Sequence, residues 1–173
     1  MRRIAVIALL AAVVPGALAQ TVSEESRVKA AYLYNFLKLV EWPPEAAAGP
    51  LVICVAGRNP FGTVLHDLVR GEVVNGRRVE ARVILEPEPG CHLLFVPDGA
   101  AMRAYLRGAS GLPVLTVGES PAFMDEGGMA RFYLERGNVR FEINPAATQR
   151  ARLYVSARLL QLARLVGPET RNE

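Results

Sequence analysis

The side chains that could perform acid–base or metal chemistry are few and scattered. The sequence holds two histidines and two cysteines, which are His66, His92, Cys54 and Cys91. His92 follows Cys91 directly, but neighbours in a strand point to opposite faces, so the imidazole is not placed to activate that thiol. No Cys-x-x-Cys pair stands near the histidines, which disfavours a zinc site. We therefore expect no metal site.

Carboxylates could replace histidine in acid–base catalysis, but spacing alone pairs none of them. Glu41, Asp125 and Glu142 are each interpreted as solvated surface charges. The segment GESPA, at 118–122, lacks the final Gly of a nucleophile elbow. The sequence also has no His-Glu-x-x-His motif and no phosphate-binding loop. These features favour a protein that is not an enzyme and that uses no cofactor.

Recognition chemistry has better support. Asn35, Lys38 and Trp42 follow one another at three- and four-residue spacing, close to one face of a helix. Trp is a common anchor in interfaces, and Lys offers a charge to an acidic partner or an anion. The alternative is that Trp42 covers the core while the stem of Lys38 lies along apolar surface. We predict that the three side chains contribute to a binding surface.

A second set of polar residues lies near the carboxyl end. Alternation divides the segment VRFEIN between two faces, with Arg140, Glu142 and Asn144 on one and Phe141 and Ile143 on the other. The simplest interpretation is a polar outer face. Glu142, Asn144 and Arg158 are further candidates for the neighbourhood of the binding surface.

A long apolar helix, predicted over 21–42, must position the first set. Thr21 and Glu24 have the spacing of a capping box, and Pro43 and Pro44 stop the helix. Apolar residues cover well over half of its circumference. The remaining narrow strip should face something other than the core, and its members are Ala31, Asn35 and Lys38.

Strand-like and helical segments alternate after this helix, which predicts an α/β fold. Strands are expected at 50–57, 77–85, 91–97 and 112–119, with a short helix in 58–71 and a helix begun by Asp98. Beyond them we predict a β-hairpin that turns at Gly137-Asn138. The expected architecture is a single compact layered domain, with a mixed sheet flanked by helices and a C-terminal β-hairpin and helix.

The last helical segment is ambiguous. Asn144 should cap a helix that has Pro145 at its first position. The segment 145–166 is compatible with one helix. It is equally compatible with two short helices joined by the extended stretch LYV, with Ser156 as the second N-cap.

The amino-terminal residues have the pattern of a signal peptide. Arg2 and Arg3 precede a short apolar run, and Ala17-Leu18-Ala19 predicts cleavage before Gln20. The alternative is an uncleaved N-terminal anchor helix, although the run is short for a bilayer. Loss of two arginines leaves 18 basic against 17 acidic residues, so the mature domain, 20–173, has a net charge of +1. We expect neither nucleic-acid binding nor membrane insertion of the mature chain. The mature protein should be located in the periplasm.

Export changes the interpretation of the cysteines. They stand 37 positions apart, and both border apolar strand-like runs. In an oxidising compartment one Cys54–Cys91 disulfide is the simplest interpretation, and two separate buried thiols are the alternative. A loop of this size would stabilise the fold by about 4 kcal/mol on the chain-entropy model.

Five segments together resemble the YfiR family of exported bacterial proteins. They occur in the order VKAAYLYNFLKLVEWP, LVICVAGRNPFG, CHLLFV, PVLTVGESPAF and VRFEINPAATQRARLYVSARLLQLA. The resemblance runs from about Val28 to Ala163. Its most specific elements are the Glu-Trp-Pro that ends the first helix and the Phe-Glu-Ile-Asn followed by a Ser-x-Arg-Leu-Leu helix.

The resemblance implies a regulatory function. The family's namesake is a dimeric periplasmic repressor that binds the periplasmic sensor domain of a YfiN-type inner-membrane diguanylate cyclase and lowers cyclic-di-GMP, which otherwise promotes biofilm formation. An outer-membrane lipoprotein can sequester it. Cys54 and Cys91 correspond to the family's widespread disulfide, whereas the namesake's second cysteine pair has no counterpart here. We expect a repressor of this kind, or alternatively a periplasmic small-molecule sensor with a pocket at the strand ends.

Overall fold

The first helix, α1 (Glu24–Leu39), begins at a local capping signal. In this computed structural model, which describes residues 22–99 and 101–167, the Ser23 hydroxyl accepts a hydrogen bond from Ser26 N–H at 3.1 Å. Glu24 and Glu25 in the first turn complement the positive end of the helix dipole. The helix therefore begins three residues later than the predicted start at 21, with Ser23 rather than Thr21 as its cap. Thr21 itself and the predicted signal peptide at 1–19 lie outside the described residues.

The same helix ends earlier than the prolines predicted. Val40 turns the chain into an extended conformation, and β1 (Val40–Glu41) pairs antiparallel with β9 (Tyr154–Val155), which lies far along the chain. Ser156 N–H also donates to the Leu39 carbonyl at 2.9 Å. A non-local ladder therefore stops the helix before Pro43 is reached.

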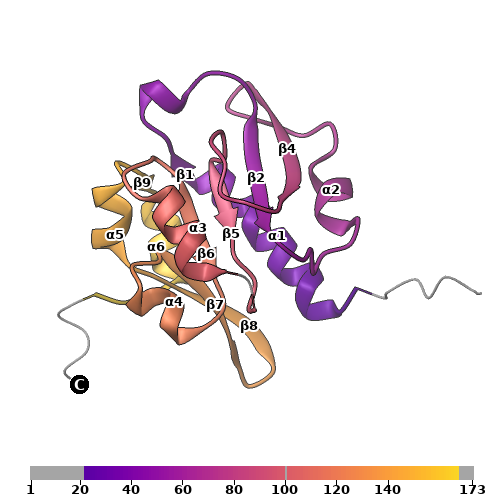
Figure 1. The fold of residues 1–173 in the computed structure, drawn as a ribbon. Coiled ribbons are helices and arrows are strands. Elements are labelled where there is room, and N and C mark those ends of the chain that lie inside the picture. Colours follow the sequence, from indigo (N-terminus) through magenta and orange to yellow (C-terminus); the bar gives the residue numbers. More distant parts are fainter. Residues whose placement is uncertain (1–21, 100, 168–173) are drawn as a thin grey trace, which may run out of the picture.

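In the described part of the chain, eight strands form one mixed sheet in the order β10-β8-β7-β6-β5-β2-β4-β3. Figure 1 labels β2 and β4 to β8 among them. The parallel centre consists of β2 (Leu51–Ala56), β4 (Arg77–Ile84), β5 (Leu93–Phe95) and β6 (Leu115–Gly118). The edges add β3 (Val73–Val74), β7 (Ala130–Glu135), β8 (Asn138–Ile143) and β10 (Arg164–Leu165). Antiparallel pairing occurs at β3–β4 and β7–β8, so the expected mixed sheet is confirmed.

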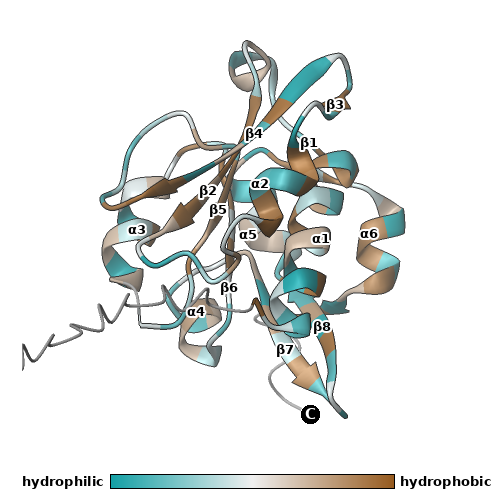
Figure 2. Cartoon of the chain, turned by 90° about the vertical axis from the view of Figure 1, so that its right-hand side faces the viewer, coloured by the Kyte–Doolittle hydropathy of each residue, from teal (hydrophilic) through white to brown (hydrophobic). Residues whose placement is uncertain are grey.

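Helices cover both faces of the sheet, as Figure 2 shows edge-on. On one face α1, α2 (Val64–Val69) and α6 (Ala157–Leu162) enclose a core that contains Phe36, Phe61, Phe95 and Phe132. On the other face α3 (Met102–Ala109) and α4 (Pro121–Asp125) enclose a second core around Cys54, Tyr105 and Phe123. The result is the predicted single layered α/β domain. No helix in the described part of the chain is long and apolar enough to cross a bilayer.

Two short helices follow β8. α5 (Pro145–Arg150) is capped by Asn144, whose Oδ1 accepts from Ala147 N–H at 3.1 Å. α6 is capped by Ser156, whose Oγ accepts from Leu159 N–H at 3.3 Å. The predicted caps are confirmed, and the ambiguous segment is two helices with an extended link between them.

Two predicted boundaries are wrong. The hairpin turns at Arg136-Gly137, one position before the expected pair, because Glu135 pairs with Asn138. Both turn residues have positive φ (50° and 78°), as a two-residue hairpin of this kind requires. Asp98 does not begin α3. Its N–H donates to a Glu119 carboxylate oxygen at 3.1 Å, which holds it in the loop.

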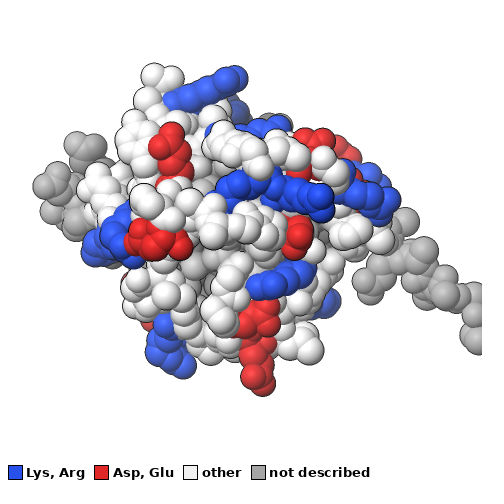
Figure 3. Space-filling model, turned by 90° about the horizontal axis from the view of Figure 1, so that it is seen from above, with Lys and Arg blue, Asp and Glu red and all other residues white. Residues whose placement is uncertain are grey.

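The surface charges are mixed. Figure 3 views the molecule from above and shows basic and acidic side chains lying close to one another on that face. Surface ion pairs include Arg152 with Glu45 and Arg103 with Glu126. This face therefore lacks the one-sided basic footprint that nucleic-acid binding requires.

Candidate functional site

The polar strip predicted on α1 is exposed to solvent. Ala31, Asn35 and Lys38 are all exposed, whereas Leu33 and Phe36 between them are buried. The Lys38 ammonium lies over the Tyr34 ring, 3.9 Å from its centroid. This contact holds the charged group against the helix surface without neutralising it, so Lys38 can still attract an anionic or acidic partner.

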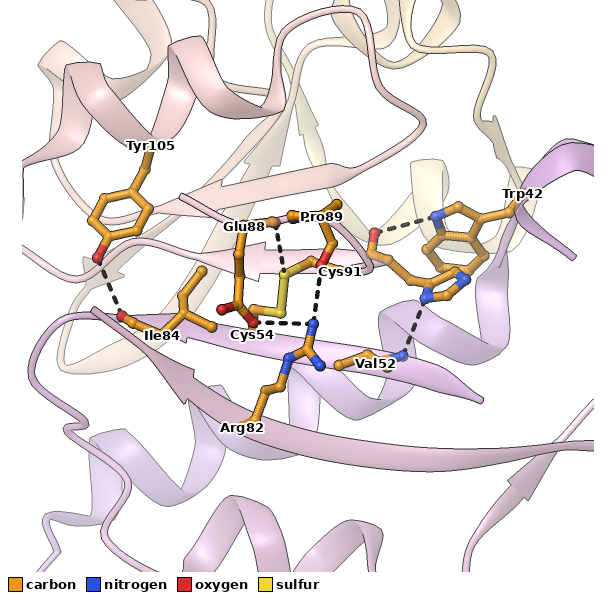
Figure 4. Close-up of a disulfide and its surroundings, with 10 residues drawn as sticks. Trp42, Val52, Cys54, Arg82, Ile84, Glu88, Pro89, Cys91 and Tyr105 are labelled. Carbon is orange, nitrogen blue, oxygen red and sulfur yellow. Dashed lines mark hydrogen bonds and ion pairs between the residues drawn. A yellow bond between two sulfur atoms is a disulfide. The ribbon is translucent and has the colours of Figure 1, made fainter. Parts of the chain in front are cut away.

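Trp42 is tied into the fold. The indole is half-buried and packs against the α1-side core. Its Nε1–H donates to the His92 carbonyl at 3.1 Å, and the two rings meet edge-on at 5.7 Å (Figure 4). The aromatic side chain therefore joins the segment after α1 to the start of β5.

His92 is a structural histidine. Its Nδ1 accepts from Val52 N–H at 3.2 Å, so the neutral ring carries its proton on Nε2, which lies 3.0 Å from the Ala46 carbonyl. Burial is the main cause that lowers the pKa of His92. The hydrogen bond to Ala46 opposes this effect, and the nearby charge of Arg77 adds to it. The ring stays neutral and anchors the loop that follows Trp42.

Cys54 and Cys91 form the predicted disulfide, with their Cα atoms 5.7 Å apart. The chain from β4 to β5 has to cross β2, and residues 85–92 make this crossing without a helix. The disulfide fastens the end of the crossing segment to β2 beneath it (Figure 4). Arg82 adds contacts with the Glu88 carboxylate and the Pro89 carbonyl, each at 3.1 Å.

The same crossing segment packs closely against α3. A Cβ added to Gly108 would lie 2.5 Å from Pro87 Cβ, which explains the glycine at this position. Tyr105 reaches across from α3 and donates to the Ile84 carbonyl at 3.1 Å (Figure 4). The disulfide and these contacts together fasten the crossing segment to β2 on one side and to α3 on the other.

Glu142 is not a solvated surface charge, contrary to the sequence interpretation. The residue is only 6% exposed. Its carboxylate accepts from Arg131 Nε at 2.5 Å and from Arg164 Nε at 3.1 Å. The three residues are direct neighbours across β7, β8 and β10. Sequence reasoning missed this cluster because the two arginines come from other strands.

A cavity of about 440 Å³ opens beside this ladder of ion-paired side chains, Arg131, Glu142 and Arg164. Its apolar part includes Met124, and its polar and charged lining consists of Asp125, Arg131, Glu142, Asn144 and Arg150. A second cavity of about 370 Å³ shares Gly127 and Arg150 with it. Arg150 has no ion-pair partner among the described residues, so its charge is available to a ligand. These hollows could accept a small polar molecule.

The structure divides the predicted site residues into two groups. Asn35 and Lys38 lie on α1, and Arg158 is exposed on α6, which packs beside α1. The β1–β9 ladder brings the end of α1 next to the start of α6, so these three residues lie in the helical layer on the same face of the sheet.

The second group lies on the other face of the sheet. Phe141 and Ile143 enter the α1-side core, so Glu142 between them points toward α4. Asn144 lines the same cavity while capping α5. Glu142 and Asn144 are therefore not brought to the α1 surface.

Sequence reasoning also overlooked Tyr154, which is 64% exposed and pairs with Glu41 in the β1–β9 ladder. An isolated Tyr in an extended link gives no local signal of this exposure. In the described ranges, no group of three or more His, Cys, Asp and Glu side chains could hold a metal ion.

Comparisons with known proteins identify the fold and the family of this chain. Among solved structures, a conserved domain protein from Vibrio cholerae O1 biovar El Tor strain N16961 matches with a TM-score of 0.51 and 11% identity, over 82% of this chain and 60% of that one. This similarity concerns the fold. A comparison with curated proteins returned no match. The family comparison matches residues 26–164, nearly all of the described chain, so the protein belongs to the YfiR/HmsC-like family.

Proposed function

We propose that this protein is a periplasmic, non-enzymatic regulator that binds the sensor domain of a membrane diguanylate cyclase and represses it, lowering cyclic-di-GMP. The family match over residues 26–164 is the observation that carries this proposal. It supports a regulatory role rather than a catalytic one. The Cys54–Cys91 disulfide supports an oxidising location, as the periplasm provides.

The mechanism we propose is a shift of population. A repressor outside the membrane cannot touch the cyclase's catalytic domain, so it must act through the conformation or dimer geometry of the sensor domain. Binding the inactive arrangement more tightly than the active one stabilises the inactive state by the difference in binding free energy. Asn35, Lys38 and Arg158 form the proposed contact surface, with Trp42 at its border. A homodimer and sequestration by an outer-membrane lipoprotein complete the proposal.

The first test is a capture experiment. Oxidised protein comprising residues 20–173 is immobilised and exposed to detergent-solubilised membranes of the source cell. We expect to recover a diguanylate cyclase that binds the immobilised protein by its periplasmic domain. Repeating the capture after reduction shows whether the Cys54–Cys91 bond matters. A reproducible blank with folded protein would contradict the proposal.

A second test follows the signal inside cells. Deleting the gene should raise cyclic-di-GMP, and deleting the captured cyclase as well should abolish that rise. An unchanged cyclic-di-GMP level in the single deletion would contradict repression even if the two proteins bind.

A small-molecule sensor is the second candidate, and the cavity beside Glu142 favours it. Its lining combines two arginines, two carboxylates and an amide with apolar side chains, which suits a small polar ligand. A thermal-shift screen with nucleotides, amino acids and inorganic anions should then give a saturable rise in Tm. Arg150→Ala should remove that rise without changing the Tm of the unliganded protein.

A further inference from the structure

The outer surface of α6 displays a row of side chains that the core does not use. We propose that this α6 ridge, formed by Tyr154, Arg158, Leu162 and Leu165, is the main docking surface for the regulated protein, and that its occupant is an acidic, amphipathic segment of the cyclase's sensor domain. The inference rests on the proposed function and adds the location and chemistry of the contact.

The ridge is unusually apolar for exposed surface. Tyr154, Leu162 and Leu165 are 64%, 65% and 46% exposed, and they lie within twelve consecutive residues. Single exposed apolar residues are ordinary, but a group of them marks an interaction surface. Arg158 and Leu162 share one face of α6 because they are four residues apart. Tyr154 and Leu165 flank the two ends of the helix. Figure 2 shows α6 on the outer side of α1.

The ridge is held rigidly at both ends. At the start, β9 pairs with β1, and Ser156 N–H donates to the Leu39 carbonyl at 2.9 Å. In the middle, Leu159 is 2% exposed and anchors α6 in the core. At the end, Val166 N–H donates to the Ile143 carbonyl at 2.9 Å. A partner would therefore meet a preorganised surface, which lowers the entropy cost of binding.

The charge of this region selects an acidic partner. Residues 145–166 contain no Asp or Glu and carry four arginines, at positions 150, 152, 158 and 164. Two of them are already paired, one with Glu45 and one with Glu142. Arg158, at the centre of the ridge, has no ion-pair partner among the described residues. An acidic group set among apolar side chains would complement Arg158, Leu162 and Tyr154 together.

A protein segment fits this surface better than a lipid surface does. α6 has six residues and lies pinned between two short strands. Interfacial helices that bury an apolar face in a membrane are typically longer and strongly amphipathic. An anionic membrane is the competing occupant, and the experiment below includes it.

The test compares two strongly exposed leucines on different parts of the surface. Leu162 is 65% exposed on the ridge, and Leu85 is 82% exposed at the end of β4. Because neither side chain supports the core, Leu162→Glu and Leu85→Glu should both keep the Tm of the wild type. Affinity for the purified periplasmic domain of the captured cyclase is measured by titration. We expect Leu162→Glu to weaken binding by about tenfold or more, as for an interface anchor, and Leu85→Glu to leave it unchanged.

Arg158→Glu supplies an independent electrostatic readout. The wild-type affinity should fall as salt rises, whereas the variant should bind more weakly and show a shallower salt dependence. Wild-type binding that neither Leu162→Glu nor Arg158→Glu weakens would overturn the ridge while leaving the proposed function intact. Absence of binding by the wild type would overturn both. Binding to phosphatidylglycerol vesicles through these residues, with none to the sensor domain, would identify a membrane as the occupant and contradict the proposal.

Discussion

Trp42 shows how a residue that resembles a binding anchor can be held by the fold. Its indole donates to the His92 carbonyl and packs against the core, yet part of the ring remains open to solvent. Both interpretations of this residue made from sequence are thus compatible with its environment. Only a substitution that separates stability from binding can distinguish them.

We expect Trp42→Ala to reduce the free energy of unfolding by about 2–3 kcal/mol, because it removes packing and a hydrogen bond. Trp42→Phe keeps most of the packing and should cost about 1 kcal/mol. Chemical denaturation measures both values, and titration with the sensor domain measures binding. If affinity drops beyond the loss of stability, the indole contacts the partner. Parallel losses would assign Trp42 to the core.

His92 should make the stability of the domain depend on pH. Burial lowers its pKa below the ordinary value of 6.5, so the unfolded chain binds a proton that the folded chain resists. Its contribution is fully present above pH 6.5 and is lost as the pH falls toward the folded-state pKa. His92→Gln should flatten the slope of unfolding free energy below pH 6.5. His66→Gln is the control, because the His66 side chain is 61% exposed, and an equal flattening there would refute the assignment.

At the scale of elements, the ladder of Arg131, Glu142 and Arg164 fixes the β7–β8–β10 edge of the sheet. Arg164 also lies over the Tyr133 ring at 4.2 Å. Removing a buried carboxylate leaves two arginines without their partner, and such a loss costs more than the pair itself contributes. Loss of the Glu142 charge should therefore destabilise this edge of the sheet.

Glu142→Gln should lower the free energy of unfolding by about 3 kcal/mol, since it leaves the charge of the largely buried Arg131 uncompensated. Glu135→Gln, on the same hairpin, is the matched control. Its contact with Arg140 at 3.8 Å joins two exposed side chains, so the change should fall within error of the wild type. Similar effects of the two substitutions in urea denaturation would show that Glu142 is not a buried ion-pair centre.

The sequence predicts those elements whose signals are local. Asn144 and Ser156 were identifiable as caps because each side chain bonds to a backbone N–H three residues later. Glu142 was misjudged because its burial arises from strands that meet only in the folded chain. The β1–β9 ladder and the end of α1 are not predictable from sequence for the same reason, because they depend on pairing between distant segments. The sequence thus identifies candidate residues one by one. Their division between the two faces of the sheet follows only from the strand pairing in the folded chain.

At the scale of the whole molecule, the two faces of the sheet differ in what stabilises them. The α1 side is held by a large aromatic core. The α3 side includes a crossing segment without a helix, which the Cys54–Cys91 bond fastens to β2. A crossover helix would hold such a connection against the sheet by packing, and here the disulfide holds it covalently.

The double variant Cys54→Ala/Cys91→Ala should lose about 4 kcal/mol of unfolding free energy, from the loop entropy restored to the unfolded chain. Guanidinium denaturation of oxidised wild type against the variant measures the difference. Reduced wild type should behave like the variant. If the variant were as stable as oxidised wild type, the crossing segment would be held by its noncovalent contacts alone.

The same bond decides how the molecule responds to force. It closes a covalent ring from residue 54 to residue 91 that encloses β4 and part of β2. When the chain is pulled by its two ends, the tension passes through the sulfur atoms and bypasses everything inside the ring. The contour length released on mechanical unfolding should therefore be shorter by roughly 120–130 Å in the oxidised protein than in the reduced one. The β3–β4 edge of the sheet lies inside this ring, so it carries no tension when the two ends of the chain are pulled.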